Sequence, residues 1–480
     1  MNLLVIDVGT SSVRAAVVSP EGEVVAERRQ PTPPATPFPG LVEVDATALA
    51  TAALDCARGV LDAAGPVEAV GVTNQRATTI VWDATTGEPV GPGLGWQDLR
   101  TVGDCLVLQA DGFRLAPNQS ATKLANLLDA HDPDRSRNLR FGTVDSWVVW
   151  QLTEGAVHVT DASNAGVTGL TLGSAPQWDP AICDRLRIVS GTLPAIVDSS
   201  GVVAPATALP GAPVIAGIAG DQQASLIGQG CVSPGGAKIT FGTGGMLDVC
   251  VGPHRPEFAV RSDHGSFPII AWQRDGQVTW GVEAIMLAAG TNIDWLVEDL
   301  GILSDAAASH EVASACTDTE GVVYVPALLG LGTPQWDFGA RGALFGLTRG
   351  SGRPHIVRAV LEGVAQRGAD LVDAVEADTG LRLDTVRVDG GMSVNPTFVQ
   401  ALANATGRRV ERCATTEGTT LGAAYLAGLA VGTWADWHDI AELWRPAEVI
   451  EPTGSLDRDR WRDAVTRAAN WHPDLSALSF

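Results

Sequence analysis

The first thirty residues alternate between apolar runs and turns. The stretch LLVIDVGT (residues 3–10) is apolar up to Asp7 and ends in Asp-x-Gly-Thr, which predicts a strand that runs into a turn. The next stretch, VRAAVVSPEGEVVAERR, has two apolar runs on either side of Pro20, Glu21 and Gly22, and it predicts a hairpin. The following QPTPPATPFPG is too rich in proline for a regular element, so it predicts a surface connection.

A helical period then replaces the strand pattern. Residues 45–64 are rich in Ala and Leu at helical spacing, and VEAVGVTNQR (residues 67–76) predicts a strand again. This mixture predicts an α/β fold for the N-terminal part. At the end of that strand, Asn74, Gln75 and Arg76 interrupt two runs of β-branched residues, so three polar side chains are expected at one mouth of the sheet.

The chain makes a second start near residue 235. GGAKITFGTGGMLDVCVG (residues 235–252) has a strand, a Gly-Thr-Gly turn and another strand, which is the arrangement of the first residues. Two related halves would explain this repetition. We therefore predict an N-terminal domain over residues 1–232 and a C-terminal domain over residues 233–480.

Two later segments have clear helical signals. VRVDGGMSVNPTFVQALANATG predicts a strand, a Gly-Gly turn and a helix, with Asn395 as its N-cap and Pro396 in its first turn. Residues 457–471 place four apolar side chains on one helical face, which predicts a docking helix. The four are Trp461, Ala464, Val465 and Ala468.

Composition narrows the class of protein. The chain has 480 residues, 45% hydrophobic and 18% charged, which is typical of a globular protein of more than one domain. Its formal net charge of -23 argues against nonspecific binding to nucleic acid or to anionic membranes. No run approaches the ~20 apolar residues of a membrane span, and residues 1–6 predict a first strand rather than a signal peptide. The seven scattered cysteines form no C-x-x-C pair and predict a reduced, cytoplasmic protein.

Two glycine-rich turns could bind phosphates. DVGTSS (residues 7–12) and FGTGG (residues 241–245) offer backbone N–H groups and small hydroxyls, and their glycines permit close approach of a ligand. Each motif alone predicts only a hairpin turn, whereas both together, at two domain starts, favour a nucleotide cleft. Asp7 could hold Mg²⁺, which prefers one or two carboxylates plus phosphates, or it could cap its own turn.

Three further residues each allow two interpretations. Asp221 follows an apolar, Gly-rich strand, where it could be a helix N-cap or a general base that accepts a hydroxyl proton. Arg76 could bind an anion or a polyol hydroxyl, or it could pair with one of the 55 acidic residues for structural reasons. Trp96 could line a site or could simply pack in the core.

Nine motifs, in order along almost the whole chain, resemble the FGGY carbohydrate kinases. They are TNQRATTIVWD, GWQDLRT, FGTVDSWVVWQLT, HVTDASNA, GIAGDQQASLIGQ, TFGTGG, ARGALFGLTRG, RVDGGMSVN and TLGAAYLAGLAVG. Within that family the chain is most similar to the glycerol kinases. The resemblance implies two actin-like, ribonuclease-H-like domains that close over a cleft, with in-line transfer of the γ-phosphoryl group of ATP to a primary hydroxyl.

The resemblance also implies roles for individual residues. It makes Asp221 the base that accepts the hydroxyl proton, and it places Asp7 and Asp221 near Mg²⁺. The implied acceptor site consists of Arg76, Ala77, Trp96, Asn118, Asp221, Gln222 and Met246. The implied nucleotide site consists of Thr10, Ser11, Ser12, Arg14, Gly242, Thr243, Gly290, Gly390, Gly391 and Asn395.

The acceptor site departs from the glycerol kinase pattern. Ala77 stands where those enzymes have a Glu that binds the polyol, and Asn118 and Met246 each replace an aromatic residue. Asn126 also stands where the family signature around Lys123 usually has Trp. Loss of one carboxylate and two rings should enlarge the pocket and weaken selectivity for glycerol.

Three functions follow from these departures. The first is a kinase of a small polyol or sugar longer than glycerol, such as a tetritol, a pentitol or a ketose. The second is a true glycerol kinase in which another residue compensates for Ala77. The third is a catalytically silent regulator that binds sugar or nucleotide, which retention of Asp7, Thr243 and Asp221 argues against. By resemblance alone, we also expect a homodimer or homotetramer.

Overall fold

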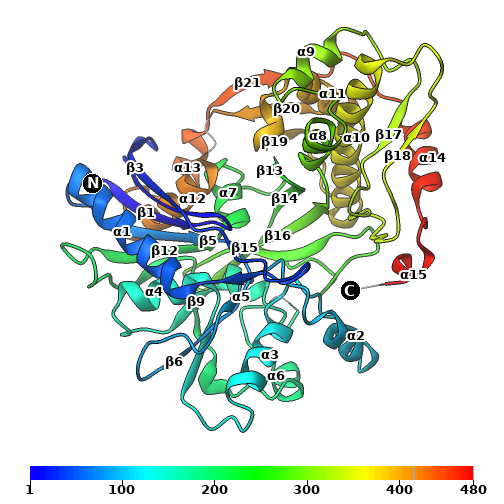
Figure 1. Ribbon diagram of the computed structural model, residues 1–480. Coiled ribbons are helices and arrows are strands. Elements are labelled where there is room, and N and C mark those ends of the chain that lie inside the picture. Colours follow the sequence, from blue (N-terminus) through cyan, green and yellow to red (C-terminus); the bar gives the residue numbers. More distant parts are fainter. Residues whose placement is uncertain (174, 415–416, 479–480) are drawn as a thin grey trace.

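The computed structural model describes residues 1–173, 175–414 and 417–478 as an arrangement of strands and helices in two halves (Figure 1). The strands are β1 (Leu3–Val8), β2 (Ser12–Val18), β3 (Val24–Pro31), β4 (Glu43–Val44), β5 (Ala69–Asn74), β6 (Ile80–Asp83), β7 (Gly93–Leu94), β8 (Leu139–Gly142), β9 (Val159–Asp161), β10 (Ala195–Val197), β11 (Ser200–Pro205), β12 (Val214–Gly220), β13 (Ala237–Phe241), β14 (Gly245–Gly252), β15 (Phe267–Arg274), β16 (Gln277–Met286), β17 (Val323–Val325), β18 (Ala343–Phe345), β19 (Thr385–Asp389), β20 (Arg409–Cys413) and β21 (Pro446–Ile450). The α-helices are α1 (Ala46–Ala64), α2 (Val102–Ala110), α3 (Ala121–His131), α4 (Val144–Leu152), α5 (Ala162–Gly166), α6 (Pro180–Arg185), α7 (Asp221–Gly228), α8 (Thr291–Asp294), α9 (Ala308–Ser314), α10 (Arg353–Thr379), α11 (Pro396–Thr406), α12 (Gly418–Val431), α13 (Trp437–Leu443), α14 (Arg458–Ala468) and α15 (Pro473–Ser476). Two short 3₁₀ turns (Ser190–Thr192 and Gly391–Val394) and one π-helical turn (Trp295–Asp299) complete the set.

The two halves repeat one strand order. In the N-terminal half the order is β3-β2-β1-β5-β12, and in the C-terminal half it is β16-β14-β13-β19-β20. In each half three antiparallel strands are followed by two parallel ones, because β1 pairs with β5 and β13 with β19 in parallel. This repetition matches the expectation of two related halves. Through β11 and β15 the two halves join into one 13-stranded sheet.

The hairpin predicted around Pro20, Glu21 and Gly22 forms, because β2 and β3 pair in antiparallel from Ser12 opposite Pro31 to Val18 opposite Val24. β1 and β2 pair along their whole length, from Leu3 opposite Val18 to Val8 opposite Val13. The chain then turns at Gly22, whose φ of 78° suits a residue without a side chain, and continues into β3. The proline-rich stretch is mostly exposed, although β3 runs on to Pro31 and so includes its first two residues.

Alternate residues of β13 and β14 lie on opposite faces of the sheet. In β13 and β14, Ile239, Phe241, Leu247 and Val249 pack with α10 and α11 in the core of the C-terminal half. The intervening residues, Lys238, Thr240, Met246 and Asp248, therefore lie on the opposite face of the sheet. That face carries polar groups where a buried sheet usually has apolar ones.

Helix α12 comes from the C-terminal sequence but packs on the N-terminal half. Its residues Leu421, Ala423 and Leu426 share a core with Leu3 and Val5 of β1. Glycines permit this close packing. A side chain at Gly422 of α12 would overlap the carbonyl of Ala224, and one at Gly228 would overlap the carbonyl of Gly418. Helices α7 and α12 thus lie backbone against backbone.

The remaining predicted elements also form. Helix α1 begins after its N-cap, Asp45, and α11 begins at Pro396 after its N-cap, Asn395. The buried residues of α14 are the predicted four, and they pack in a cluster with Val325, Ala327, Leu331 and Ala340. The seven cysteines all lie in the described residues, and none of them takes part in a disulfide.

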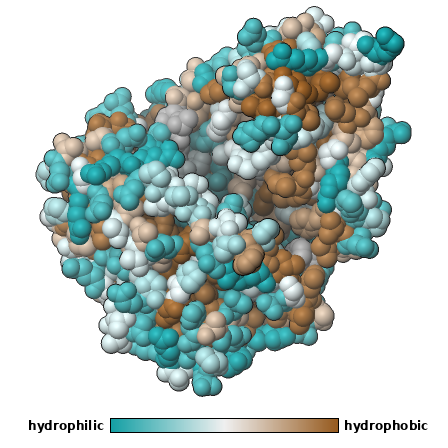
Figure 2. All heavy atoms as spheres, viewed as in Figure 1, coloured by the Kyte–Doolittle hydropathy of each residue, from teal (hydrophilic) through white to brown (hydrophobic). Residues whose placement is uncertain are grey.

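A hollow separates the two halves on the face shown in Figure 2. Apolar side chains gather on the C-terminal side of this hollow, and hydrophilic ones are more frequent on the N-terminal side (Figure 2). Among the helices of the described residues, none combines the length and the apolar character that a bilayer crossing requires.

Candidate functional site

The loop after β5 is held rigidly by hydrogen bonds. The backbone N–H of Gln75 donates to Val8 O (2.8 Å). The Gln75 side chain donates to Gly9 O (3.2 Å) and accepts from the Thr78 hydroxyl (3.0 Å). The next strand, β6, leaves the main sheet and pairs with β8. Asn74 forms a reciprocal amide pair with Asn164 of α5, at 3.0 and 3.1 Å. Arg76 therefore projects from a fixed loop.

Asp221 begins α7 at the end of β12. The N-cap of this helix is Gly220, so the interpretation of Asp221 as an N-cap is wrong. Its Oδ1 instead accepts from the Gln222 amide N–H (2.8 Å), and the carboxylate favours the first turn because the helix dipole is positive there. About a third of its side chain (32%) is exposed, so the carboxylate can meet a ligand.

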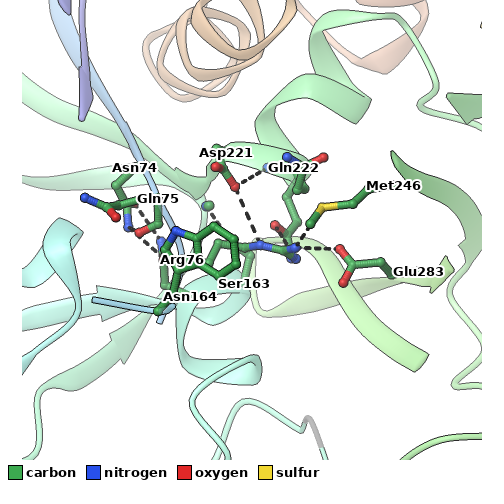
Figure 3. Close-up of polar contacts among 12 residues, drawn as sticks. Asn74, Gln75, Arg76, Ser163, Asn164, Asp221, Gln222, Met246 and Glu283 are labelled. Atoms are coloured by element: carbon green, nitrogen blue, oxygen red, sulfur yellow. Dashed lines mark hydrogen bonds and ion pairs between the residues drawn. The ribbon is translucent and has the colours of Figure 1, made fainter. Parts of the chain in front are cut away.

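The guanidinium of Arg76 lies between two carboxylates (Figure 3). Its Nε is 3.6 Å from Asp221 Oδ1, and its Nη2 is 2.6 Å from Glu283 Oε2. Gly220 permits this position, because a Cβ there would lie 2.8 Å from the Arg76 stem. Burial acts to lower the pKa of Arg76, but the charges of Glu283 and Asp221 hold it above its ordinary value.

Burial also shifts the two carboxyl groups. It raises the pKa of Asp221 above its ordinary value against the opposing charge of Arg76. It raises the pKa of Glu283 to about 7, where Arg76 opposes the rise and Asp248 adds to it. A carboxylate whose pKa lies above its usual range is a stronger base, which suits Asp221 to accept a proton.

The C-terminal half contributes a row of charges opposite Arg76. Lys238, Asp248 and Glu283 are direct neighbours across β13, β14 and β16. Lys238 Nζ lies 2.7 Å from Asp248 Oδ2 and donates to the Gln222 side chain at 2.6 Å. Met246, two residues before Asp248, places its sulfur 3.9 Å from Arg76 Nη2.

The turn between β1 and β2 lies beside Trp96. The half-buried indole of Trp96 donates to the Thr10 hydroxyl (3.2 Å), and its backbone N–H donates to the Thr78 hydroxyl (3.2 Å). Trp96 thus links the loop of Arg76 to the turn of residues 9–12. Ser12 accepts from Arg29 (2.9 Å).

Asp7 fits a site for Mg²⁺. Burial and the negative charge of Asp221 raise its pKa to about 7. Two carboxylates that repel each other in this way would gain from a divalent cation between or beside them. Within residues 1–173, 175–414 and 417–478, no three side chains form a metal cluster, and Mg²⁺ needs none because it binds through one or two carboxylates plus phosphate oxygens.

Glycines of the C-terminal half form a cradle that fits a nucleotide. The Gly290 N–H donates to Gly242 O (2.8 Å), which joins the β13–β14 turn to α8. A side chain at Gly390 would overlap the backbone of Phe241, so the turn after β19 lies close to the end of β13. A Cβ at Gly391 would meet nothing within 4 Å, which leaves this side of the cradle open.

Some predicted residues have other partners. Arg14 forms ion pairs with Glu27 and Glu417, and Asn395 caps α11 while it donates to Ser309 (2.9 Å). Between described residues, no hydrogen bond links Asn118 to Arg76 or to the residues around it.

Lys123 explains the placement of two predicted acceptor-site residues. This buried lysine donates to Gly95 O (2.8 Å), beside Trp96, and to the backbone O of Asn118 (3.3 Å). The two loops that carry Trp96 and Asn118 are therefore held by the amino group of one lysine.

Sequence reasoning missed Lys238, Asp248 and Glu283. Each is a single charge in an otherwise apolar strand, as in AKITF and GMLDVCVG. Such a charge is costly to bury unless it has a partner. The available signal was the presence of three such charges, each in a strand that becomes a neighbour of the others' strands in the sheet.

Comparisons with known proteins identify the family. The models of the FGGY family of carbohydrate kinases match residues 2–228 with the N-terminal domain and residues 237–431 with the C-terminal domain. The glycerol kinase of Aromatoleum aromaticum is 42% identical over 98% of this chain and 99% of its own length. Glycerol kinase 2 of Thermotoga maritima is 40% identical over the same shares.

Solved structures have the same fold. The glycerol kinase of Plasmodium falciparum, a structure with ADP, has a TM-score of 0.89 at 27% identity and covers 100% of this chain and 99% of its own. The xylulose kinase of Rhodospirillum rubrum has a TM-score of 0.85 at 23% identity, with 99% of this chain and 100% of its own covered, and it shows the fold alone. The predicted two-domain α/β sugar kinase fold is thereby confirmed. This chain belongs to the FGGY family of carbohydrate kinases, enzymes that phosphorylate sugars or polyols with ATP.

Proposed function

We propose that this protein transfers the γ-phosphoryl group of ATP to a primary hydroxyl of a small polyol, and that its preferred acceptor is longer than glycerol. The observation that carries the proposal is the position of Asp221. Its carboxylate lies at the positive end of α7, remains a third exposed and pairs with Arg76 where the two halves meet. A base in this position can meet an acceptor hydroxyl.

The acceptor side performs positioning and proton transfer. Asp221 takes the proton of the reacting hydroxyl as its oxygen attacks the γ-phosphorus, and the bond from that phosphorus to the β–γ bridging oxygen breaks. Arg76 orients the acceptor, because its N–H groups donate to hydroxyl oxygens and its loop is fixed by Gln75. Closure of the two halves excludes water, which would otherwise compete as an acceptor.

The donor side holds phosphates. Backbone N–H groups of the turns at residues 10–12 and 242–244 would bind them, and the open side at Gly391 would leave room for the nucleoside. Mg²⁺ would neutralise charge on the phosphate oxygens, and Asp7 with Asp221 would hold it.

Three residues support an acceptor longer than glycerol. Ala77, Asn118 and Met246 are smaller or more flexible than the acidic and aromatic residues that the family resemblance leads one to expect. Ala77 has a left-handed φ of 59° and its carbonyl accepts from Ser120 (3.0 Å). Its side chain is a methyl group, which offers no hydrogen bond to a polyol. A site without these groups has more room beside Arg76 and rejects a longer chain less strongly.

A second candidate is glycerol itself as the preferred acceptor. The relatives at 40–42% identity are named glycerol kinases, and Glu283 places a carboxylate 2.6 Å from Arg76 in spite of Ala77. That carboxylate is the compensation which a true glycerol kinase would need.

An acceptor screen separates the candidates. ADP release is coupled to a dehydrogenase, and kcat/KM is compared for glycerol, erythritol, threitol, ribitol, xylitol and xylulose. We expect at least one longer acceptor to exceed glycerol. A clear preference for glycerol would contradict the longer acceptor and favour the second candidate. Measurable ATP binding without turnover of any acceptor would instead identify a silent regulator.

A further inference from the structure

Arg76 and Glu283 join the two halves of the molecule at the acceptor site. Arg76 comes from the loop after β5, and Glu283 comes from β16, more than two hundred residues later in the chain. Their side chains are 12% and 8% exposed, and Figure 3 shows the Glu283 carboxylate directed at the guanidinium, on the side away from Asp221. The guanidinium therefore spans two carboxylates from different halves.

A polyol bound along Arg76 would span the same two carboxylates. When its reacting hydroxyl lies at Asp221 and its chain lies along the guanidinium of Arg76, its remote end reaches Glu283. An alcohol hydroxyl can donate one hydrogen bond to a carboxylate and accept another from Arg76. The Arg76–Glu283 pair is nearly closed to solvent, so a hydroxyl bound there would exchange water for charged partners. An acceptor that lacks this hydroxyl would leave the two charged groups without that hydrogen bond.

The row behind Glu283 argues against a purely structural role. Lys238 and Asp248 are fully buried, and Asp248 lies directly opposite Glu283 in the sheet. Two adjacent buried carboxylates are costly, and apolar residues would stabilise these strands at least as well. Instead, each end of the row contacts a predicted acceptor-site residue. Lys238 donates a hydrogen bond to the Gln222 side chain, and Glu283 accepts one from Arg76.

We propose that Glu283 is an acceptor-binding residue that determines specificity: its carboxylate accepts a hydrogen bond from the acceptor hydroxyl remote from the one that Asp221 activates. This inference rests on the proposed kinase function. Lys238 is a positioning residue, since it donates to Gln222 and pairs with Asp248 without meeting the acceptor. Glu283 thus supplies the carboxylate that Ala77 does not.

The test uses pairs of acceptors that differ only in the remote hydroxyl. One pair is glycerol and propane-1,2-diol, and the other is erythritol and its 1-deoxy analogue. For the wild type we expect kcat/KM to favour the complete polyol at least ~10-fold, as the loss of a hydrogen bond to a charged group implies. For Glu283→Gln we expect this preference to fall to within ~3-fold, chiefly through a higher KM for the polyol, with ATP affinity unchanged.

The design separates the competing explanations. Each preference is a ratio from one preparation, so a lower fraction of folded enzyme cancels. If Glu283→Gln does not fold, Glu283→Asp retains the charge and should reduce the preference at least threefold. The control Glu376→Gln removes a carboxylate from an ion pair between α10 and Arg408 and should keep the wild-type ratio.

Two results would overturn the inference. An unchanged preference in the Glu283 variants, with both acceptors slowed equally, would show that Glu283 acts only through Arg76. Absence of turnover of every acceptor by the wild type, the longer ones of the screen included, would refute the proposed function itself, and the inference with it.

Discussion

Arg76 is a charged side chain at the end of a buried strand, and its neighbours explain its presence. It lies between Asp221 and Glu283 and packs on Gly220 and Met246. A structural arginine needs one carboxylate, whereas this one meets two from different halves of the molecule. Of the two, Asp221 is the more exposed, and so it is the one that we expect to meet the reacting hydroxyl.

Replacement of Asp221 tests its role as the base. Asp221→Asn keeps the size of the side chain but removes its basicity, so we expect kcat to fall by at least ~10² while the protein stays folded. Steady-state kinetics and thermal denaturation measure the two effects. Asp459→Asn is the control, because Asp459 also lies in the first turn of a helix, α14, and is fully exposed. Near-normal turnover in folded Asp221→Asn would remove Asp221 from its role.

At the scale of elements, the position of Asp221 depends on how closely α7 packs. Helix α12 contacts α7 through glycines, and it also lies over the glycines of β5 and β12, since a side chain at Gly71 or Gly217 would meet its backbone. The two helices and the two strands therefore form one tightly packed layer. A shift of α12 would move α7, and with it Asp221 and Gln222 at the start of that helix.

A methyl group at Gly422 tests this coupling. In an exposed helix, Gly→Ala stabilises by up to ~1 kcal/mol, but at Gly422 the methyl would overlap the Ala224 carbonyl. We expect Gly422→Ala to lower the free energy of unfolding by at least ~2 kcal/mol and to lower kcat as α7 moves. Gly103→Ala in α2, where no atom lies within 4 Å of the new methyl, should be neutral or stabilising. Wild-type stability and turnover in Gly422→Ala would contradict this account of the packing.

At the scale of the whole molecule, the site concentrates acidic groups where the halves meet. Asp7, Asp221, Asp248 and Glu283 all lie there, and burial raises the pKa of Asp7 and of Glu283 to about 7. An acid whose pKa is raised by folding keeps its proton to a higher pH in the folded state than in the unfolded state. Its ionisation therefore opposes folding, and stability is lost as pH rises from about 4 to about 7.

Asp7→Asn should make the protein more stable and abolish phosphoryl transfer. The amide cannot ionise, so the unliganded variant should be more stable than the wild type by at least ~1 kcal/mol at pH 8, and the difference should vanish near pH 4. Phosphoryl transfer should nevertheless be lost, because the amide cannot hold Mg²⁺ as a carboxylate does. Urea denaturation at the two pH values measures the difference. A variant less stable than the wild type at pH 8 would show that the Asp7 carboxylate stabilises the fold.

Local signals predicted individual elements but not how distant ones meet. The hairpin around Gly22, helix α1 after Asp45 and the buried face of α14 all depend on neighbouring residues, and all form as predicted. The row of Lys238, Asp248 and Glu283 depends on the register of three strands, which no single segment contains. The packing of α12 on the N-terminal half likewise depends on glycines far apart in the chain.

The candidate site divides in the same way. The polar loop at Arg76 and the acidic residue after β12 were evident in the sequence, because each interrupts an apolar run. The partners of these residues were not evident, since Glu283 reaches Arg76 only after both halves have folded. The roles proposed for these residues rest on geometry and family resemblance, and the kinetic tests above address them.

The most direct test of the central claim is identification of the product. The protein is incubated with ATP, Mg²⁺ and each acceptor of the screen, and the mixture is analysed by ³¹P NMR and mass spectrometry. We predict a phosphate monoester on a terminal carbon of the acceptor, formed in equal amount with ADP by the wild type and not by Asp221→Asn. Release of inorganic phosphate with ADP, or no reaction with any acceptor, would contradict the assignment of this chain as a polyol kinase.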